Sequence, residues 1–182
     1  MKIIETGFKD LFIIEPPVFE DARGYFFESY NQEKFNSMGI SFYPVQDNES
    51  QSCRGVIRGL HYQLNPAAQA KLIRVVEGEI FDIALDLRKG SPTFGKTYGT
   101  IINSNNKRQF FIPRGFAHGF SVLSNKAIIN YKCDNLYSPE LERGIRYNDP
   151  GLAIDWKIKR DEEIISSKDK NNPLFKDAEM NF

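Results

Sequence analysis

This sequence has few cysteines and no net charge, and each of these features argues against a class of protein. The 182 residues contain only Cys53 and Cys133, too few for the disulfide framework of a small secreted protein. Lys plus Arg number 24 and Asp plus Glu number 24, so the formal net charge is 24 − 24 = 0. A balanced chain produces no broad field that would attract nucleic acid or an anionic membrane. We therefore expect any bound phosphate to be held by a few placed cations.

Long apolar runs are also missing. The opening "MKIIETGFKD" reaches Glu5 and Asp10 before an apolar run forms, which argues against a signal peptide. No stretch approaches the roughly 18–20 apolar residues that a membrane span needs. We expect a cytoplasmic protein, and the length suits one domain covering residues 1–182.

Short strands separated by turns dominate what is present. β-Branched and aromatic residues gather in short segments, and Gly, Pro and Asn lie between them. In "FDIALDL", Phe81 and Ile83 share one face with Leu85 and Leu87, and Asp82, Ala84 and Asp86 share the other. This pattern predicts an all-β sandwich or barrel of the jelly-roll type. The expected strands lie within residues 11–16, 24–30, 71–87, 99–103, 108–113, 119–123 and 127–133.

Few segments favour helix. Residues 32–38 are expected to form a short helix, with Asn31 as its N-cap and Gly39 as its stop. Residues 160–167 could form another. The polar tail over residues 166–177 is typical of loop, and the sequence shows neither an internal repeat nor a linker.

The sequence contains only two histidines, and each has a glycine within two residues of it. His61 follows Arg58 in "RGLHYQ", and nearby cations would keep its imidazole neutral and usable as a general base. Strict alternation would place Arg58 and His61 on opposite faces of a strand. A bulge at Gly55 or Gly59 would bring them together. His118, in "IPRGFAHGF", has the same alternative as His61: a packed, hydrogen-bonded structural histidine.

Other chemistries find little support. No H-x-H pair occurs, so a metal site would need both histidines and carboxylates from elsewhere. Neither cysteine neighbours a histidine, and no G-x-S-x-G, P-loop or G-x-G-x-x-G motif is present. Tyr131, in "AIINYKC", shares a face with Ile129 and Cys133 and could be a core residue. The remaining polar candidates could each be solvated surface groups, but together they supply a base, a phenol, cations and amides.

The order of several motifs is more informative than any one of them. "DARGYFFESYN", "QDNES", "IRGLHYQ", "NKRQFFIPRGFAHGF", "YKCDNLYSPELERGIRYNDP" and "SSKDK" follow one another across nearly the whole chain. The chain resembles the dTDP-4-dehydrorhamnose 3,5-epimerase family, a group with the cupin fold. The resemblance implies a homodimer without metal or cofactor, in which an N-terminal strand can join the partner's sheet. It also implies inversion of carbons 3 and 5 of dTDP-4-dehydro-6-deoxy-D-glucose, giving dTDP-4-dehydro-L-rhamnose.

The resemblance also implies roles for individual residues. His61 matches the base, Asp169 the carboxylate that orients it, Tyr131 the acid on the other side of the sugar, and Lys71 the group that stabilises the enolate. Two local departures are Ala70, where the family usually has Gly, and Arg114, where Pro or Glu is common. The matching substrate contacts are Arg23, Glu28, Gln46, Asp47, Asn48, Arg58, His118, Tyr137, Glu142 and Lys168.

Three alternatives remain open at this point. A mono-epimerase would invert only carbon 3 or carbon 5 and could keep the same catalytic residues. A non-catalytic cupin that binds a sugar nucleotide would tolerate loss of the base or the acid. A metal-dependent cupin would need a stoichiometric transition metal.

Overall fold

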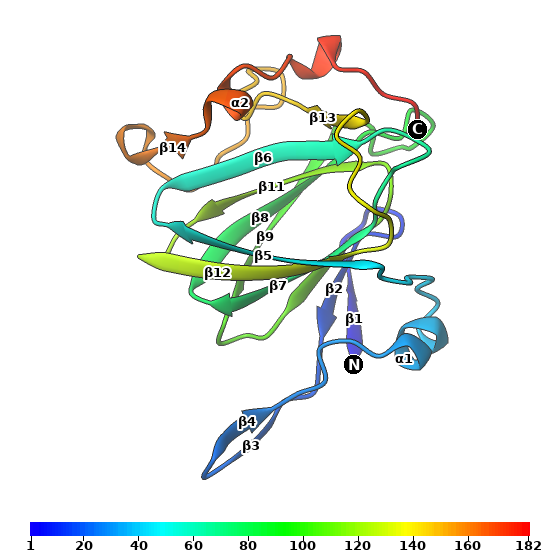
Figure 1. Ribbon diagram of the computed structural model, residues 1–182, viewed down its shortest axis with the longest axis vertical. Coiled ribbons are helices and arrows are strands. Elements are labelled where there is room, and N and C mark those ends of the chain that lie inside the picture. The colour runs from blue at the N-terminus through cyan, green and yellow to red at the C-terminus, as the bar shows by residue number, and fades with distance from the viewer.

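Two antiparallel sheets face each other in the computed structural model, which describes all residues 1–182 (Figure 1). The first sheet has the order β1-β2-β10-β7-β12-β5, and the second has the order β13-β6-β11-β8-β9, with β14 added beside β6. This arrangement confirms the predicted all-β jelly roll. The first sheet comprises β1 (Lys2–Glu5), β2 (Phe12–Glu15), β10 (Gln109–Ile112), β7 (Lys71–Glu77), β12 (Lys126–Cys133) and β5 (Gln46–Cys53). The second comprises β13 (Glu142–Gly144), β6 (Val56–Gln63), β11 (Phe116–Val122), β8 (Glu79–Asp86), β9 (Thr97–Asn103) and β14 (Ile164–Ile165).

The main core lies between the two sheets. Ile73 and Phe110 from the first sheet pack in one cluster with Ala84 and Phe120 from the second. Each such side chain removes apolar surface from water, which contributes about 1.5–3 kcal/mol for a fully buried large side chain. The alternation of apolar and polar residues in β8 does not mean that one face is exposed, because Asp82 and Asp86 are completely buried. The strand is covered on both faces.

Helix α1 (Gln32–Ser37) forms as predicted. Asn31 Oδ1 accepts a hydrogen bond from Lys34 N at 3.0 Å, and Gly39 follows the helix with a φ of +79°. Phe35 and Phe42 are fully buried in a cluster with Leu72, so the helix and the chain after it cover the outer face of the first sheet. This covering layer also lies against the start of β7.

The expectations for the C-terminal region were partly wrong. Residues 160–167 do not form one helix, because only Arg160–Glu162 make a 3₁₀ turn and Ile164–Ile165 pair with β6 as β14. β-Branched residues favour this pairing over a helix. The tail expected as loop contains helix α2 (Ser167–Lys170), whose first turn is capped by Ser166 Oγ, and a 3₁₀ turn at Phe175–Asp177.

A hairpin stands away from both sheets. β3 (Phe19–Asp21) and β4 (Gly24–Phe26) pair only with each other and project from the body of the molecule (Figure 1). The strand expected over residues 24–30 therefore ends at Phe26. The hairpin exposes 63% of Phe19, 55% of Tyr25 and 69% of Phe26, which is unusual for three large side chains so close together. None of the helices in the chain is long and apolar enough to cross a membrane.

Candidate active site

An irregularity in β6 sets up the site. His61 lies opposite His118 of β11, but Arg58 lies opposite Phe120, so β6 contains an extra residue between them. The irregularity falls at Gly59, whose φ is +124° and where an added Cβ would lie 2.5 Å from Gly119 Cα. Because Phe120 faces the core between the sheets, Arg58 and His61 both turn toward this interior. The predicted bulge at Gly59 is therefore confirmed.

A cavity of about 120 Å³ opens between the sheets beside His61. His61 comes from β6 of one sheet, whereas Lys71 on β7 and Tyr131 on β12 come from the opposite sheet. Lys71 lies opposite Cys133 in register, two residues from Tyr131, so both side chains turn to the same interior face. The cavity is lined by Gln46, Asn48, His61, Tyr62, Gln63, Gln69, Lys71, Tyr131, Cys133, Tyr137 and Glu142.

His61 is oriented by a carboxylate from the C-terminal segment. Its Nε2 lies 2.6 Å from Asp169 Oδ1, and Gly59 N donates to Asp169 Oδ2 at 3.3 Å. The His61 side chain is 30% exposed and that of Asp169 only 4%. Burial by itself would raise the pKa of Asp169, but the hydrogen bond and charge of His61, with the other donors, outweigh it and hold that pKa below its ordinary value. Asp169 is therefore an ionised partner that can stabilise an imidazolium.

Lys71 and Tyr131 supply an amine and a phenol, groups that can donate a proton or a hydrogen bond, whereas the ionised Asp169 can only accept one. Burial lowers the pKa of the Lys71 amine, and the nearby Cys133, Glu142 and Asp82 oppose this shift. Burial also raises the pKa of the Tyr131 phenol, which Cys133 reinforces and Arg58 opposes. The phenol therefore holds its proton at neutral pH and can act as an acid. The site combines an imidazole on one side with a phenol and an amine on the other.

A small polar network includes four of the residues that line the cavity. Glu142 Oε2 accepts hydrogen bonds from Tyr137 Oη at 2.8 Å and from Lys168 Nζ at 2.6 Å. Gln46 Oε1 accepts from Tyr137 N at 2.9 Å, and Gln46 Nε2 donates to Asn48 Oδ1 at 3.0 Å. These five predicted site residues are thus brought together at one edge of the cavity.

His118 lies next to the site but does not line the cavity. Its Nε2 is 2.6 Å from Asp82 Oδ1, and its side chain is only 10% exposed. Arg58 is also outside the lining, with Nε donating to Ser52 Oγ at 3.1 Å, although its charge acts on Tyr131. Both predicted contacts therefore lie outside the lining of the cavity.

Three predicted contacts are not brought to the cavity of their own chain. Asp47 lies between Gln46 and Asn48 on the opposite face of β5, where its carboxylate binds Lys132 Nζ at 2.6 Å. Arg23 pairs with Asp21 in the exposed hairpin, and Glu28 pairs with Lys34 of α1 at 2.8 Å.

Sequence reasoning missed several lining residues. Gln63 connects two segments beside the cavity, because its Nε2 donates to Ala67 O at 2.6 Å and its Oε1 accepts from Ser138 N at 2.7 Å. Gln63 lies two residues after His61 in the same strand, and Cys133 lies two after Tyr131, so strand alternation was the signal that could have found both. Gln69 precedes β7, where no alternation applies.

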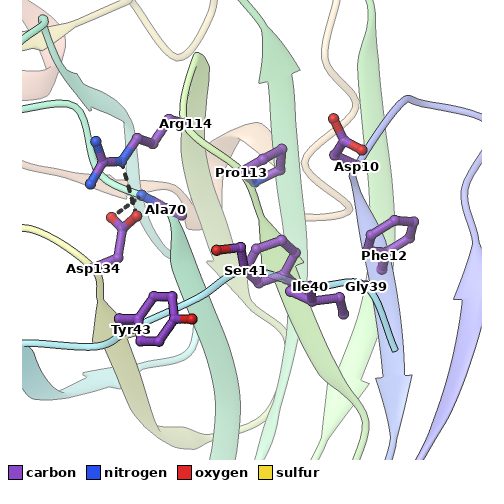
Figure 2. Close-up of a pocket in the computed structure, with 11 residues that line it drawn as sticks. Asp10, Phe12, Gly39, Ile40, Ser41, Tyr43, Ala70, Pro113, Arg114 and Asp134 are labelled. Atoms are coloured by element: carbon purple, nitrogen blue, oxygen red, sulfur yellow. Dashed lines mark hydrogen bonds and ion pairs between the residues drawn. The ribbon is translucent and has the colours of Figure 1, made fainter. Parts of the chain in front are cut away.

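A larger cavity, of about 510 Å³, lies elsewhere on the first sheet and contains none of the predicted site residues (Figure 2). Apolar side chains such as Phe12 and Ile40 form part of its wall, and Arg114 and Asp134 form an ion pair at one end, at 2.9 Å. Size alone therefore does not locate the chemistry, because the smaller cavity holds the imidazole, phenol and amine.

Comparison with known proteins identifies the family of the chain. The family model described as dTDP-4-dehydrorhamnose 3,5-epimerase matches residues 5–177. The chain belongs to this family. It is 51% identical over 181 residues to the dTDP-4-dehydrorhamnose 3,5-epimerase of Methanothermobacter thermautotrophicus, covering 96% of this chain and 97% of that protein. The expected isomerase class and family are thereby confirmed.

Solved structures agree with the fold as well as the sequence. The crystal structure of dTDP-4-dehydrorhamnose 3,5-epimerase from Elizabethkingia anophelis is 54% identical with a TM-score of 0.93, covering 97% of each chain. A dTDP-6-deoxy-D-glucose-3,5-epimerase from Legionella pneumophila, in complex with dTDP-4-keto-L-rhamnose, is 49% identical with a TM-score of 0.91, covering 95% of this chain and 92% of that one. The cupin-type jelly roll expected from the motifs is confirmed by these likenesses.

Proposed function

We propose that residues 1–182 act as one epimerase domain that inverts carbons 3 and 5 of dTDP-4-dehydro-6-deoxy-D-glucose, giving dTDP-4-dehydro-L-rhamnose. The observation that carries the proposal is the placement of His61 and Tyr131 on opposite sheets across one cavity. Inversion requires removal of a proton from one face of a carbon and delivery of a proton to the other. An acid and a base on opposite walls meet this requirement.

The substrate's ketone at carbon 4 makes the hydrogens on carbons 3 and 5 acidic. His61 removes one of them, and the negative charge moves to the ketone oxygen as an enolate forms. The Lys71 ammonium stabilises this charge as it develops. Asp169 holds the His61 tautomer and stabilises the imidazolium that results, and Tyr131 then donates a proton to the opposite face of the planar carbon. The imidazolium then loses its proton to water and the phenolate regains one from water, so that the same pair can invert the second carbon. No oxidation or external reductant is needed.

The rest of the nucleotide sugar is held by the border of the cavity. Arg58 binds the diphosphate through directional guanidinium–phosphate contacts, with Lys168 as a second cation once it leaves Glu142. Gln46, Asn48 and Tyr137 supply amide and aromatic contacts to the sugar or the nucleoside. His118 supports the ketone end from the neighbouring strand, and its partner Asp82 helps to keep Lys71 charged. This local arrangement suits a chain with zero net charge.

A homodimer accounts for the predicted contacts that lie away from the cavity. Arg23 is 90% exposed at its side chain and lies on a hairpin whose aromatic side chains Phe19, Tyr25 and Phe26 are more than half exposed. We place this hairpin against the site of a second copy, where Arg23 and Glu28 contact the nucleotide. Asp47, on the outer face of β5, faces the same copy. Strand β1 is one edge of the first sheet and offers unpaired backbone groups to a partner.

Two features of the chain fit a cytoplasmic location. Cys53 is exposed and Cys133 is buried, and both are free thiols. Free thiols at the surface are typical of a reducing compartment.

Incubation with dTDP-4-keto-6-deoxyglucose in deuterated water, followed by proton NMR, tests the function. We expect the wild-type protein to exchange the protons on carbons 3 and 5 and to form the product with both centres inverted. Exchange and inversion at one carbon only would identify a mono-epimerase. No exchange by folded protein would favour a binding protein or another nucleotide sugar. The same assay on protein purified without a histidine tag and treated with a chelator tests the metal-dependent alternative, because loss of exchange would contradict the mechanism above.

A further inference from the structure

A charged cluster lies at the end of β7 that carries Lys71. Ala70 directly precedes β7 and Asp134 directly follows β12, so each is one residue away from the aligned pair Lys71 and Cys133. Asp134 Oδ1 accepts a hydrogen bond from Ala70 N at 2.7 Å, and Asp134 N donates to Ala70 O at 3.2 Å. The two residues therefore bind each other reciprocally at the end of the ladder between β7 and β12.

Arg114 fixes the carboxylate of this pair. It belongs to the turn between β10 and β11, and its Nε donates to Asp134 Oδ2 at 2.9 Å. Figure 2 shows Arg114 and Ala70 both next to the Asp134 carboxylate, and each carboxylate oxygen has its own donor. The Asp134 side chain is 13% exposed, and charge-assisted bonds of this kind are stronger than neutral ones. The carboxylate cannot rotate without losing one of them.

Further hydrogen bonds join the same two segments. Gln69 Nε2 donates to Asn135 O at 2.8 Å, and Asn135 Nδ2 donates to Pro66 O at 3.1 Å. Gln69 also lines the catalytic cavity. Lys71 is the first residue of β7, so its backbone position depends on how firmly the chain before it is held.

We propose that Asp134, held by Arg114, is a positioning residue for Lys71: it fixes the backbone at Ala70 so that the ammonium is aimed at the ketone oxygen. This inference rests on the enolate-stabilising role proposed above for Lys71. Neither Asp134 nor Arg114 lines the catalytic cavity, so both act through the backbone rather than by touching substrate.

The test compares kcat and KM of four variants. Asp134→Ala removes both bonds, and we expect kcat to fall about tenfold or more while KM stays within about twofold, because an error of about 1 Å in a catalytic group costs up to about a hundredfold. Asp134→Asn keeps an oxygen for Ala70 but presents an NH₂ group to Arg114. It should therefore resemble Arg114→Ala, with a loss of about threefold. Combining Arg114→Ala with Asp134→Ala should cost no more than Asp134→Ala alone.

Glu15→Ala is the matched control, because Glu15 pairs with Arg108 at 2.7 Å in the same sheet and both are partly exposed. It should change thermal stability without changing kcat. Lys71→Met is measured in parallel. If Lys71→Met keeps its kcat, the role of Lys71 fails and this proposal falls with it. If Lys71→Met loses activity but Asp134→Ala does not, or if Asp134→Asn is as poor as Asp134→Ala, the positioning role alone is wrong.

Discussion

The two histidines of the chain make the same contact in different surroundings. His61 Nε2 lies 2.6 Å from a carboxylate oxygen of Asp169, and His118 Nε2 lies 2.6 Å from one of Asp82. The two rings are direct neighbours in register on β6 and β11. Yet the His61 side chain is 30% exposed and lines a cavity, whereas that of His118 is 10% exposed and does not. Bond length and ring chemistry therefore do not distinguish a base from a structural group here.

The origin of each carboxylate explains the difference. Asp82 comes from β8, the strand next to His118, so the pair is enclosed by the sheet itself. Asp169 comes from α2, 108 residues along the chain from His61, and reaches the ring from outside the ladder. An imidazole held from one side by a distant segment leaves its other side free for substrate. The comparison teaches that access to the ring decides which pair carries out proton transfer.

Replacement of the accessible histidine should produce the largest effect. His61→Ala removes the base, so we expect kcat to fall by about 10²- to 10⁴-fold. Stability should change by only about 1 kcal/mol, because Asp169 keeps its bond from Gly59 N and gains water from the cavity. Steady-state kinetics together with urea unfolding measures both quantities. Near-native turnover would show that His61 is not the base.

Replacement of the enclosed His118 should lower stability more than it lowers activity. His118→Ala leaves the fully buried Asp82 carboxylate without its only hydrogen bond, since Asp82 Oδ2 already lacks a partner. We expect a loss of about 3 kcal/mol or more in the free energy of unfolding. The folded fraction should lose about tenfold or less in kcat, well below the loss in His61→Ala. A variant as stable as wild type but inactive would reverse the assignment of the two pairs.

Several features of this site could be predicted from the sequence. β-Branched and aromatic residues marked β7, β8 and β12, and Gly55 and Gly59 were the two places where a bulge could bring Arg58 and His61 to one face; the structure has it at Gly59. Asp47 faces away from the cavity because Gln46 and Asn48 face toward it. That outcome follows from strand alternation once residues 46–53 are known to be a strand.

Other parts could not be read from local pattern. β5 is an edge strand with few apolar residues, so it lacks the hydrophobic signal by which strands are recognised. α2 has four residues, too few for helical periodicity, and its Asp169 is fixed by His61 and Gly59, which lie far away in sequence. The burial of Asp82 and Asp86 in β8 likewise depends on partners elsewhere: His118 for Asp82, and Arg88 with Ser91 for Asp86.

Replacement of Asp169, the carboxylate of the accessible pair, should have the smallest effect, a pH-dependent change in the free energy of unfolding. The pKa of Asp169 is lowered in the fold below its ordinary value of 3.8. Its ionised form therefore stabilises the fold above that ordinary pKa, and this contribution disappears as the pH falls through the lowered value. Asp169→Asn should cost about 2 kcal/mol near pH 7, and the difference from wild type should shrink as the pH falls below the ordinary pKa of an aspartate and through the lowered value. Urea unfolding of both proteins across this range measures it. A difference that does not change with pH would mean that the pair is held by shape and neutral hydrogen bonding, and the imidazolium formed during catalysis would then lack its charged partner.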